Sequence, residues 1–173
     1  MRIESPRLLL RPYTPEDFED YFAYIRDRQL QADLGVEELD DRDCALINFQ
    51  WLMENREFLA LVSRETGRAI GHICVHPPDR VVAEAPEFQG KKGASLSFAI
   101  AKQEQRKGLM TEALEALIPA LFQRDGLDYL DCEYTPGNTA SGAVQKKLGF
   151  RYWGTERFEG VELLVHILRG SAQ

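Results

Sequence analysis

The chain has 173 residues, of which 44% are hydrophobic and 28% charged, as is ordinary for a globular protein with one core. Its formal net charge of −7 disfavours nucleic acid and anionic lipid as partners and favours cations or polar amines. No apolar run approaches the roughly 20 residues of a membrane helix, and the N-terminal segment lacks the long apolar region of a secretory signal. We therefore expect one domain over residues 1–173, placed in the cytoplasm, with no nucleic-acid or membrane partner.

The first half of the chain predicts a strand, two helices and a hairpin. Residues 7–13 form a short apolar stretch with prolines at its ends, typical of an edge strand. A helix follows, with Thr14 as its cap and Asp17 completing a capping-box pattern. A second helix begins at about Asp40, with a buried stripe formed by Ala45, Leu46, Phe49, Leu52 and Met53. Residues 58–64 and 69–76 alternate like strands and are joined by a short turn that contains Gly67.

The second half predicts four more strands and two helices. Residues 77–92 form a polar loop that is either mobile or functional. A strand over 93–101 precedes a helix from Gly108, which Pro119 should kink or end early. A strand over 127–135, a helix over 138–148 and a hairpin of 150–158 with 161–168 complete the chain. This order predicts an α/β (α+β) fold with a mixed, mostly antiparallel central sheet of about seven strands and helices on both faces.

Residues that suit a phosphate ligand gather where the strand 93–101 gives way to the following helix. The first N–H groups of a helix have no partner within it, and the helix dipole adds positive potential there. Lys102, Arg106 and Lys107 add positive charge, and Gly108 allows close approach of the main chain. The segment is therefore either a pyrophosphate-binding loop or an ordinary polar loop before a helix.

Four segments resemble parts of one enzyme superfamily. The segment Gln105-Arg106-Lys107-Gly108-Leu109-Met110 is similar to the Q/R-x-x-G-x-G/A acetyl-CoA loop of the GNAT acetyltransferases, although Met110 stands where Gly or Ala is preferred. Further on, Asn138-Thr139-Ala140-Ser141 and Lys147-Leu148-Gly149-Phe150 resemble the two ends of that superfamily's next helix. The opening Arg7-Leu8-Leu9-Leu10-Arg11-Pro12 is similar to the branch of ribosomal-protein N-terminal acetyltransferases. The resemblance covers nearly the whole chain and implies a GNAT fold that binds acetyl-CoA.

The resemblance also implies which residues hold the cofactor. Pantetheine would lie along the main chain of one strand, the pyrophosphate along the loop and helix start, and the thiol near the later helix. The implied cofactor-binding residues are Phe98, Ala99, Ile100, Gln105, Arg106, Lys107, Gly108, Leu109, Met110, Thr111, Asn138 and Ser141. No metal site is expected, because Cys44, Cys74 and Cys132 are far apart and form no metal-binding pattern.

The implied chemistry is direct attack of a neutral amine on the thioester, with main-chain N–H groups stabilising the oxyanion. Ser141 either donates a hydrogen bond to the leaving sulfur or bonds locally to the backbone. Gln145 stands where many members carry a general-acid tyrosine, and Ser95 where this branch often has a glutamate.

The group that accepts the amine proton remains open among three candidates. Glu133 is either a catalytic base or a member of a structural ion pair, and His72 and His76 are the alternatives. Cys132 lies between Asp131 and Glu133, which disfavours a thiolate, so we expect it to be a packing residue.

Two functions of different classes remain at this point. The first is an N-acetyltransferase that uses acetyl-CoA to modify a primary amine, on a protein N-terminus or a small molecule. The second is a catalytically weak GNAT-fold module that binds acyl-CoA as a sensor or interaction domain. The chain would act as a monomer or a homodimer, with Tyr152, Trp153 and Phe158 either at an interface or in the core.

Overall fold

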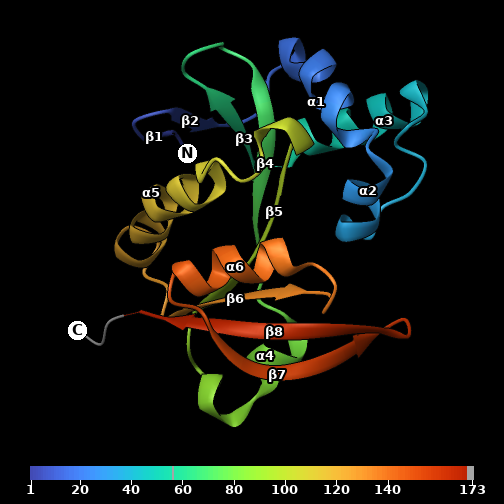
Figure 1. Ribbon diagram of the computed structural model, residues 1–173. Helices are drawn as coiled ribbons and strands as arrows, with labels where there is room; N and C mark the ends of the chain where they lie inside the picture. The colour runs from blue at the N-terminus through green and yellow to red at the C-terminus, as the bar shows by residue number, and fades with distance from the viewer. Residues whose placement is uncertain (56, 171–173) are drawn as a thin grey trace. The chain divides into compact units, whose positions relative to one another are not determined.

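The structure is a computed structural model that describes residues 1–55 and 57–170 (Figure 1). Its strands form one sheet in the order β1-β2-β3-β4-β5-β6-β8-β7, so that β8 lies between β6 and β7. β5 and β6 are parallel, whereas β1 with β2, β2 with β3, β3 with β4, β6 with β8 and β7 with β8 are antiparallel. The strands are β1 Ile3–Glu4, β2 Leu8–Arg11, β3 Phe58–Ser63, β4 Ala69–His76, β5 Gly93–Ile100, β6 Tyr129–Tyr134, β7 Arg151–Phe158 and β8 Val161–Arg169.

Six α-helices and three short 3-10 helices complete the described part of the chain. The α-helices are α1 Phe18–Ile25, α2 Arg28–Leu34, α3 Arg42–Glu54, α4 Arg80–Glu84, α5 Leu109–Gln123 and α6 Thr139–Lys147. The 3-10 helices are η1 Pro15–Asp17, η2 Pro86–Phe88 and η3 Lys102–Glu104. The mixed α/β class and the mostly antiparallel sheet are confirmed. The sequence-based count of strands was one short, because β1 has only two residues and leaves no periodic signal.

The chain divides into two compact units. The first unit contains Met1–Cys74 and Phe98–Ala116, and the second contains Val75–Ser97 and Leu117–Gln173. An aromatic cluster forms the core of the first unit, where the rings of Tyr13, Tyr21 and Phe49 meet at centroid distances of 5.2 to 6.1 Å. Replacing one such buried ring by alanine typically costs about 3–5 kcal/mol. This core therefore fixes α1 and α3 against each other.

The capping box that the sequence predicts lies at the start of η1, which runs directly into α1. Thr14 and Asp17 form the reciprocal contacts, and Arg11 donates to both carboxylate oxygens of Asp17 at 2.6 and 2.8 Å. In α3 the cap is Asp41, and Ala45, Phe49 and Leu52 are buried as predicted. Leu46, expected in the same stripe, is 38% exposed. The stripe is therefore narrower than the apolar pattern indicated.

The segment 77–92, expected as a loop, contains α4 and η2. The Asp79 carboxylate accepts the N–H groups of Val81 and Val82 and so begins α4. Val82 and Phe88 are fully buried, and Phe88 packs on Tyr129 with a ring centroid distance of 4.3 Å. These apolar contacts form the core of the second unit together with Val165. The prediction of a structureless loop was wrong because the apolar residues of this segment are too few to show a helical period.

α5 continues through Pro119, so the expected early end of this helix was wrong. Proline removes one backbone hydrogen bond and crowds the preceding turn. The neighbouring side chains of Leu117 and Leu121 are almost completely buried in this structure. Their burial holds the helix together across the proline, since each buried leucine contributes about 1.5–3 kcal/mol.

The closing hairpin agrees with the sequence. β7 and β8 pair from Arg151 with Ile167 to Phe158 with Val161. Both turn residues, Glu159 and Gly160, have positive φ values of 48° and 85°. Positive φ at both central positions is typical of the tight turns that join antiparallel strands.

No helix in residues 1–55 and 57–170 is long and apolar enough to cross a membrane.

Candidate active site

The strand that the resemblance assigns to pantetheine is the end of β5. Phe98 and Ile100 are half-buried and Ala99 is buried. Gly71 of β4 lies so near that a Cβ atom on it would stand 2.3 Å from the Ala99 carbonyl oxygen. The close approach of the two backbones at this point therefore depends on the missing side chain of Gly71.

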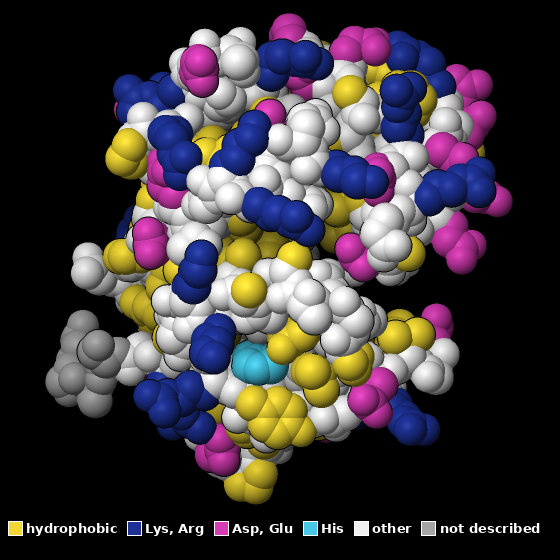
Figure 2. Space-filling model, in the orientation of Figure 1, with side chains coloured by type: hydrophobic (Ala, Val, Ile, Leu, Met, Phe, Trp, Pro, Cys, Tyr) yellow, Lys and Arg dark blue, Asp and Glu magenta, His cyan; other side chains and the backbone are white. Residues whose placement is uncertain are grey.

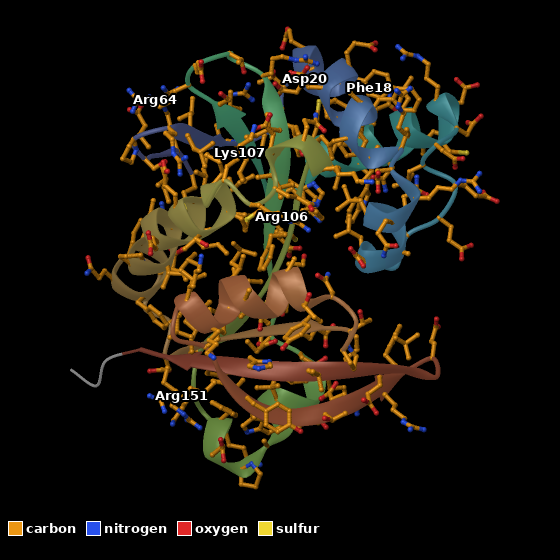
Figure 3. All side chains as sticks on the ribbon, in the orientation of Figure 1. Phe18, Asp20, Arg64, Arg106, Lys107 and Arg151 are labelled. Atoms are coloured by element: carbon orange, nitrogen blue, oxygen red, sulfur yellow. The ribbon has the colours of Figure 1, made fainter. Side chains whose placement is uncertain are left out.

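The predicted pyrophosphate loop is an exposed turn that leads directly into α5. Gln105, Arg106, Lys107 and Gly108 are all exposed, and α5 begins at Leu109. The backbone has positive φ at Arg106 (63°) and Gly108 (74°), on either side of Lys107. Figure 3 labels Arg106 and Lys107 beside this helix start, and Figure 2 shows Lys and Arg side chains gathered over the same region. The loop thus presents helix N–H groups together with positive charge.

The first two residues of α5, Leu109 and Met110, offer only their main chain to a ligand. Leu109 and Met110 are 7% and 5% exposed, so their side chains belong to the core, and Thr111 is half-buried. Met110 therefore fits the loop despite its size, because its side chain points into the protein. Glu112 has the first main-chain N–H of α5 that forms a helical hydrogen bond to the residue four positions earlier. It donates to the Gly108 carbonyl at 3.0 Å.

Glu112 joins this helix start to the N-terminal strand region. Its Oε1 accepts the Ser5 hydroxyl at 2.7 Å and the Arg7 main-chain N–H at 2.8 Å. Its Oε2 accepts Arg7 Nε at 2.6 Å, and Arg7 Nη1 donates to the Lys107 carbonyl at 3.1 Å. Burial alone would raise the pKa of Glu112, but the hydrogen bonds from Ser5 and Arg7 outweigh it and lower the pKa. The carboxylate is therefore ionised at neutral pH.

Asn138 and Ser141 lie together at the start of α6, in the second unit. The Asn138 side chain caps the helix and accepts the Ser141 N–H at 3.1 Å. The Ser141 hydroxyl oxygen accepts Gln145 Nε2 at 3.2 Å. Gln145 is buried, and its Oε1 has no hydrogen-bond partner among the described residues. The structure thus brings two of the predicted cofactor residues into contact, whereas Phe98 to Thr111 belong to the first unit.

Glu133 belongs to a group of carboxylates in the second unit that we call the acid cluster, formed by Asp79, Asp131, Glu133 and Glu156. Oxygen atoms of Asp79, Glu133 and Glu156 lie within 4.8 Å of one another. Part of the Glu133 side chain is exposed, yet burial of its carboxyl and the charge of Asp79 raise its pKa. Carboxylates at this spacing share protons or hold a cation. The structural ion pair considered for Glu133 is not found among the described residues.

Two other members of the acid cluster, Asp131 and Glu156, also have raised pKa values. Burial raises the pKa of Asp131 to about 6, although Ser95 and the Asp79 N–H oppose the rise. Burial and the charges of Asp79, Glu133 and Asp131 raise the pKa of Glu156 to about 7. One oxygen of Asp131 and one of Glu156 have no hydrogen-bond partner within the described part of the chain. The cluster therefore contains groups that exchange protons near neutral pH.

The two histidine candidates have different surroundings. His72 is buried in the first unit, where its Nδ1 and the Tyr24 hydroxyl are 2.9 Å apart. Burial lowers its pKa to about 4, so it is neutral at physiological pH. His76 is half-buried, with its Nδ1 3.0 Å from the Pro77 carbonyl oxygen. Cys132 is a packing residue as expected, because burial raises the pKa of its thiol far above the physiological range.

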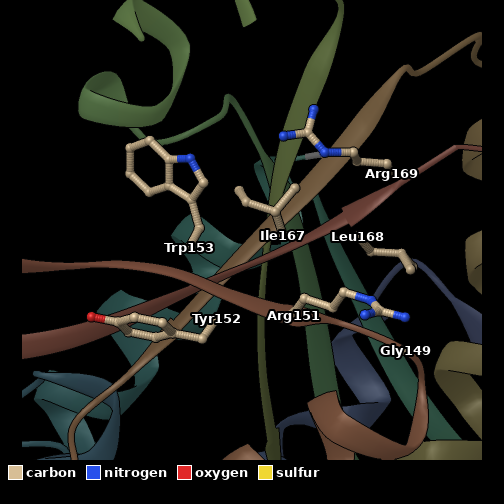
Figure 4. A pocket seen from close by; sticks show the side chains of 7 residues that line it. All are labelled: Gly149, Arg151, Tyr152, Trp153, Ile167, Leu168 and Arg169. Atoms are coloured by element: carbon tan, nitrogen blue, oxygen red, sulfur yellow. The ribbon is translucent and has the colours of Figure 1, made fainter. Parts of the chain in front are cut away.

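A separate pocket of about 250 Å³ lies on the closing hairpin (Figure 4). It is lined by Gly149, Arg151, Tyr152, Trp153, Ile167, Leu168 and Arg169. Glu87 accepts Arg169 Nη2 at 2.6 Å and Trp153 Nε1 at 3.1 Å, and these bonds hold one wall of the pocket. None of the residues predicted for catalysis or cofactor binding lines it. Tyr152 and Phe158 are 60% and 66% exposed, so the core reading of these two rings was wrong.

Sequence reasoning missed the Arg7–Glu112 pairing and three members of the acid cluster. Asp131 and Glu133 alternate along one strand, and this period of two could have placed them on one face. Asp79 and Glu156 come from distant segments, so only tertiary structure brings them to Glu133. Arg7 and Glu112 likewise lie 105 residues apart and follow no common pattern.

Comparisons with known proteins agree with this fold. Residues 7–151 match the family described as the acetyltransferase (GNAT) domain. The chain is similar to the uncharacterized N-acetyltransferase YnaD of Bacillus subtilis, with 23% identity over 154 residues that cover 89% of this chain and 85% of the relative.

Two solved structures share the fold over 98% of this chain. Ribosomal-protein-S5-alanine acetyltransferase from Vibrio fischeri has a TM-score of 0.76 and 16% identity, with 96% of its own chain covered. RimJ of Mycobacterium smegmatis, in complex with CoA-disulfide, has a TM-score of 0.72 and 17% identity, with 87% covered. The family match spans most of the sequence, and the chain therefore belongs to the GNAT acetyltransferases.

Proposed function

We propose that this acetyltransferase uses acetyl-CoA to acetylate a primary amine by direct transfer, in the cytoplasm and as one domain over residues 1–173. The acceptor is a protein N-terminus or a small-molecule amine, and the enzyme acts as a monomer or homodimer. The observation that carries the proposal is the exposed loop of Arg106, Lys107 and Gly108, which leads into the N-terminus of α5. Unpaired helix N–H groups, the helix dipole and two cationic side chains suit a pyrophosphate.

The proposed cofactor residues belong to three elements, namely this loop, β5 and the start of α6. Pantetheine contacts the main chain of Phe98, Ala99 and Ile100, and the pyrophosphate contacts residues 105–111. Asn138 and Ser141 contact the thiol end. The GNAT family match and the CoA-disulfide bound by the related RimJ support this assignment.

The proposed chemistry assigns one role each to Glu133 and Ser141. Glu133 accepts the proton of the attacking amine, directly or through water, because its raised pKa makes it a stronger base than an ordinary carboxylate. The neutral amine nitrogen attacks the thioester carbonyl and passes this proton to Glu133 as the C–N bond forms, the C–S bond breaks, and the thiolate of CoA leaves. Ser141 donates a hydrogen bond to the departing sulfur. An α-amine, with a pKa near 8, needs less help from such a base than a lysine side chain near 10.4.

A titration of the protein with acetyl-CoA by calorimetry tests the cofactor assignment. We expect binding by the wild-type protein and about tenfold weaker binding by Gly108→Ala, whose positive φ disfavours a side chain in the loop. Gly90→Ala is the matched control, because Gly90 has a φ of +75° and open space around it but lies outside the loop. Absence of binding by the wild-type protein would overturn the cofactor assignment.

A thiol-release assay against N-terminal peptides and small amines tests the reaction. The amines on which thiol is released identify the acceptor class. Binding of acetyl-CoA without turnover on any amine would support the acyl-CoA sensor instead. Glu133→Gln should lower kcat by about 10²- to 10⁴-fold and remove the acidic limb of the pH profile. Glu162→Gln, an exposed carboxylate of β8, is the control. An unchanged kcat in Glu133→Gln would exclude it as the base.

A further inference from the structure

We propose that Arg7 is a positioning residue for the phosphate-binding loop and fixes the shape in which residues 105–111 meet acetyl-CoA. This inference rests on the proposed cofactor site and adds to it a residue from a distant part of the chain. Arg7 precedes β2, whereas the loop precedes α5, and both belong to the first unit.

The Arg7 guanidinium links the loop to the helix that follows it. Arg7 Nη1 donates to the Lys107 carbonyl at 3.1 Å, and Arg7 Nε donates to Glu112 Oε2 at 2.6 Å. The third nitrogen, Nη2, lies next to the helix start, since a Cβ on Gly108 would stand 3.8 Å from it. One side chain thus contacts the loop, the helix start and the first turn of α5.

The carbonyl that Arg7 holds lies at the most constrained point of the loop. Lys107 is flanked by Arg106 and Gly108, which both have positive φ. Arg106 is not a glycine, so its left-handed backbone carries a cost that surrounding contacts must offset. The bond from Arg7 to the Lys107 carbonyl is such a contact, and it fixes the peptide between the two left-handed residues.

Glu112 in turn holds Arg7 in place. Its side chain is only 16% exposed, and its two oxygens accept the main chain and the guanidinium of Arg7 as well as the Ser5 hydroxyl. Hydrogen bonds to a charged group are stronger than those between neutral groups. Arg64 also holds the N-terminal segment, since it donates to the Ser5 carbonyl at 2.9 Å. The contacts of Glu112 and Arg64 therefore hold the segment that carries Arg7 in place.

The geometry requires arginine and not merely a positive charge. Arg7 donates to a carboxylate through Nε and to a carbonyl through Nη1, which needs the rigid fork of a guanidinium. A lysine has a single terminal nitrogen and cannot span both acceptors in this way. Arg7→Lys therefore keeps the charge and removes the tether.

Binding of CoA to Arg7→Lys and Arg7→Ala, measured by calorimetry, tests the proposal. We expect the Kd for CoA to rise roughly tenfold in both variants, the effect of losing one charge-assisted hydrogen bond that positions the loop. Arg2→Ala is the matched control, because Arg2 is exposed and, among the described residues, pairs with the nearby Glu4 alone. A Kd within twofold of wild type in Arg7→Ala would overturn the proposal.

A second substrate separates positioning of the loop from a general structural role. S-acetylpantetheine carries the thioester but no pyrophosphate, so kcat/KM for this substrate should stay within about twofold in Arg7→Lys. The kcat at saturating acetyl-CoA should also be retained, with the loss confined to KM. An equal loss of kcat/KM with both substrates would overturn the proposal in favour of a structural role.

Hydrogen exchange of the unliganded protein supplies a measurement that does not need the cofactor. Amides of residues 105–111 should exchange faster in Arg7→Lys than in wild type, while those of Arg2→Ala stay unchanged. Equal exchange in all three proteins would overturn the positioning role. Failure of wild-type protein to bind CoA would instead overturn the proposed function, so the two failures are distinguishable.

Discussion

Gln145 donates its side-chain N–H to the hydroxyl oxygen of Ser141 at 3.2 Å, one turn earlier on α6. Gln145 occupies the position where many GNAT enzymes carry a tyrosine, and it is buried. A serine hydroxyl that accepts a hydrogen bond keeps its own hydrogen for another partner. Gln145 thus leaves Ser141 able to donate, which suits the role proposed for it at the leaving sulfur.

Ser141→Ala tests this role. The variant removes the hydroxyl but keeps the main-chain N–H that Asn138 caps, so α6 should stay intact. We expect kcat to fall by roughly 10-fold to 100-fold with little change in the KM for acetyl-CoA, because the hydrogen bond strengthens as charge develops on sulfur. Steady-state kinetics measure both constants. Thr139→Ala, at an exposed site on the same helix, should leave them unchanged, and an unaltered kcat in Ser141→Ala would exclude Ser141 from the chemistry.

Gly71→Ala should destabilise the protein by about 2–4 kcal/mol. The added Cβ would meet the Ala99 carbonyl oxygen at 2.3 Å, and this neighbour is backbone that cannot turn away. Chemical denaturation measures the change in the free energy of unfolding. Gly137→Ala is the control, since a Cβ there meets nothing within 4 Å. Equal stability of the two variants would show that β4 and β5 can separate at this point without cost.

Glu156→Gln should stabilise the protein at alkaline pH. The pKa of Glu156 is raised to about 7 in the folded state from 4.5, so the folded protein binds its proton more tightly than the unfolded chain. The contribution of this bound proton to the free energy of unfolding is fully present below pH 4.5 and is lost as the pH rises through 7. We expect the Tm of the variant to exceed that of wild type by about 2–4 °C at pH 8, the shift for roughly 1 kcal/mol in a chain of this size. At pH 5 the two Tm values should be nearly equal. If Glu156→Gln raised the Tm equally at pH 5 and pH 8, the result would contradict charge repulsion within the acid cluster.

His72→Gln should reduce the sensitivity of the protein to acid. The pKa of His72 falls to about 4 in the folded state from 6.5, so the unfolded chain binds this proton first. The stability from neutral His72 is present above pH 6.5 and is lost as the pH falls toward 4. The free energy of unfolding of wild type, measured against that of the variant, should therefore decline between pH 6.5 and 4. A constant difference over this window would mean that the histidine is protonated in both states at the same pH.

A further prediction concerns the buried hydroxyl of Tyr24, which contacts His72. Tyr24 bonds to the Tyr13 hydroxyl at 2.6 Å and to His72 Nδ1 at 2.9 Å. Tyr24→Phe leaves both partners buried without this contact, at a cost of about 1–3 kcal/mol. Urea denaturation measures the loss. Tyr152→Phe is the control, because the Tyr152 side chain is 60% exposed and its hydroxyl can exchange Thr155 for water.

The sequence by itself determined the class of fold and the family. Strand alternation, the capping box at Thr14 and the turn at Glu159 and Gly160 act over a few residues, so a local pattern suffices to read them. The loop around Gly108 and the motif from Asn138 to Phe150 are also local, and the family match over residues 7–151 agrees with them. Local patterns likewise indicated that Cys132 is inert.

Only the tertiary structure decided which distant groups meet. Pro119 was expected to kink α5 or end it early, but the helix continues past it, and the burial of Leu117 and Leu121 offsets the lost hydrogen bond. Asp79 and Glu156 reach Glu133 from separate segments, so that its neighbours are carboxylates and not the cation of the ion pair that was one of its two predicted roles. Arg7 and Glu112 meet across 105 residues. Burial and charge contacts of this kind depend on the folded backbone and leave no periodicity in the sequence, which is why the sequence placed the loop but not the residues that hold it.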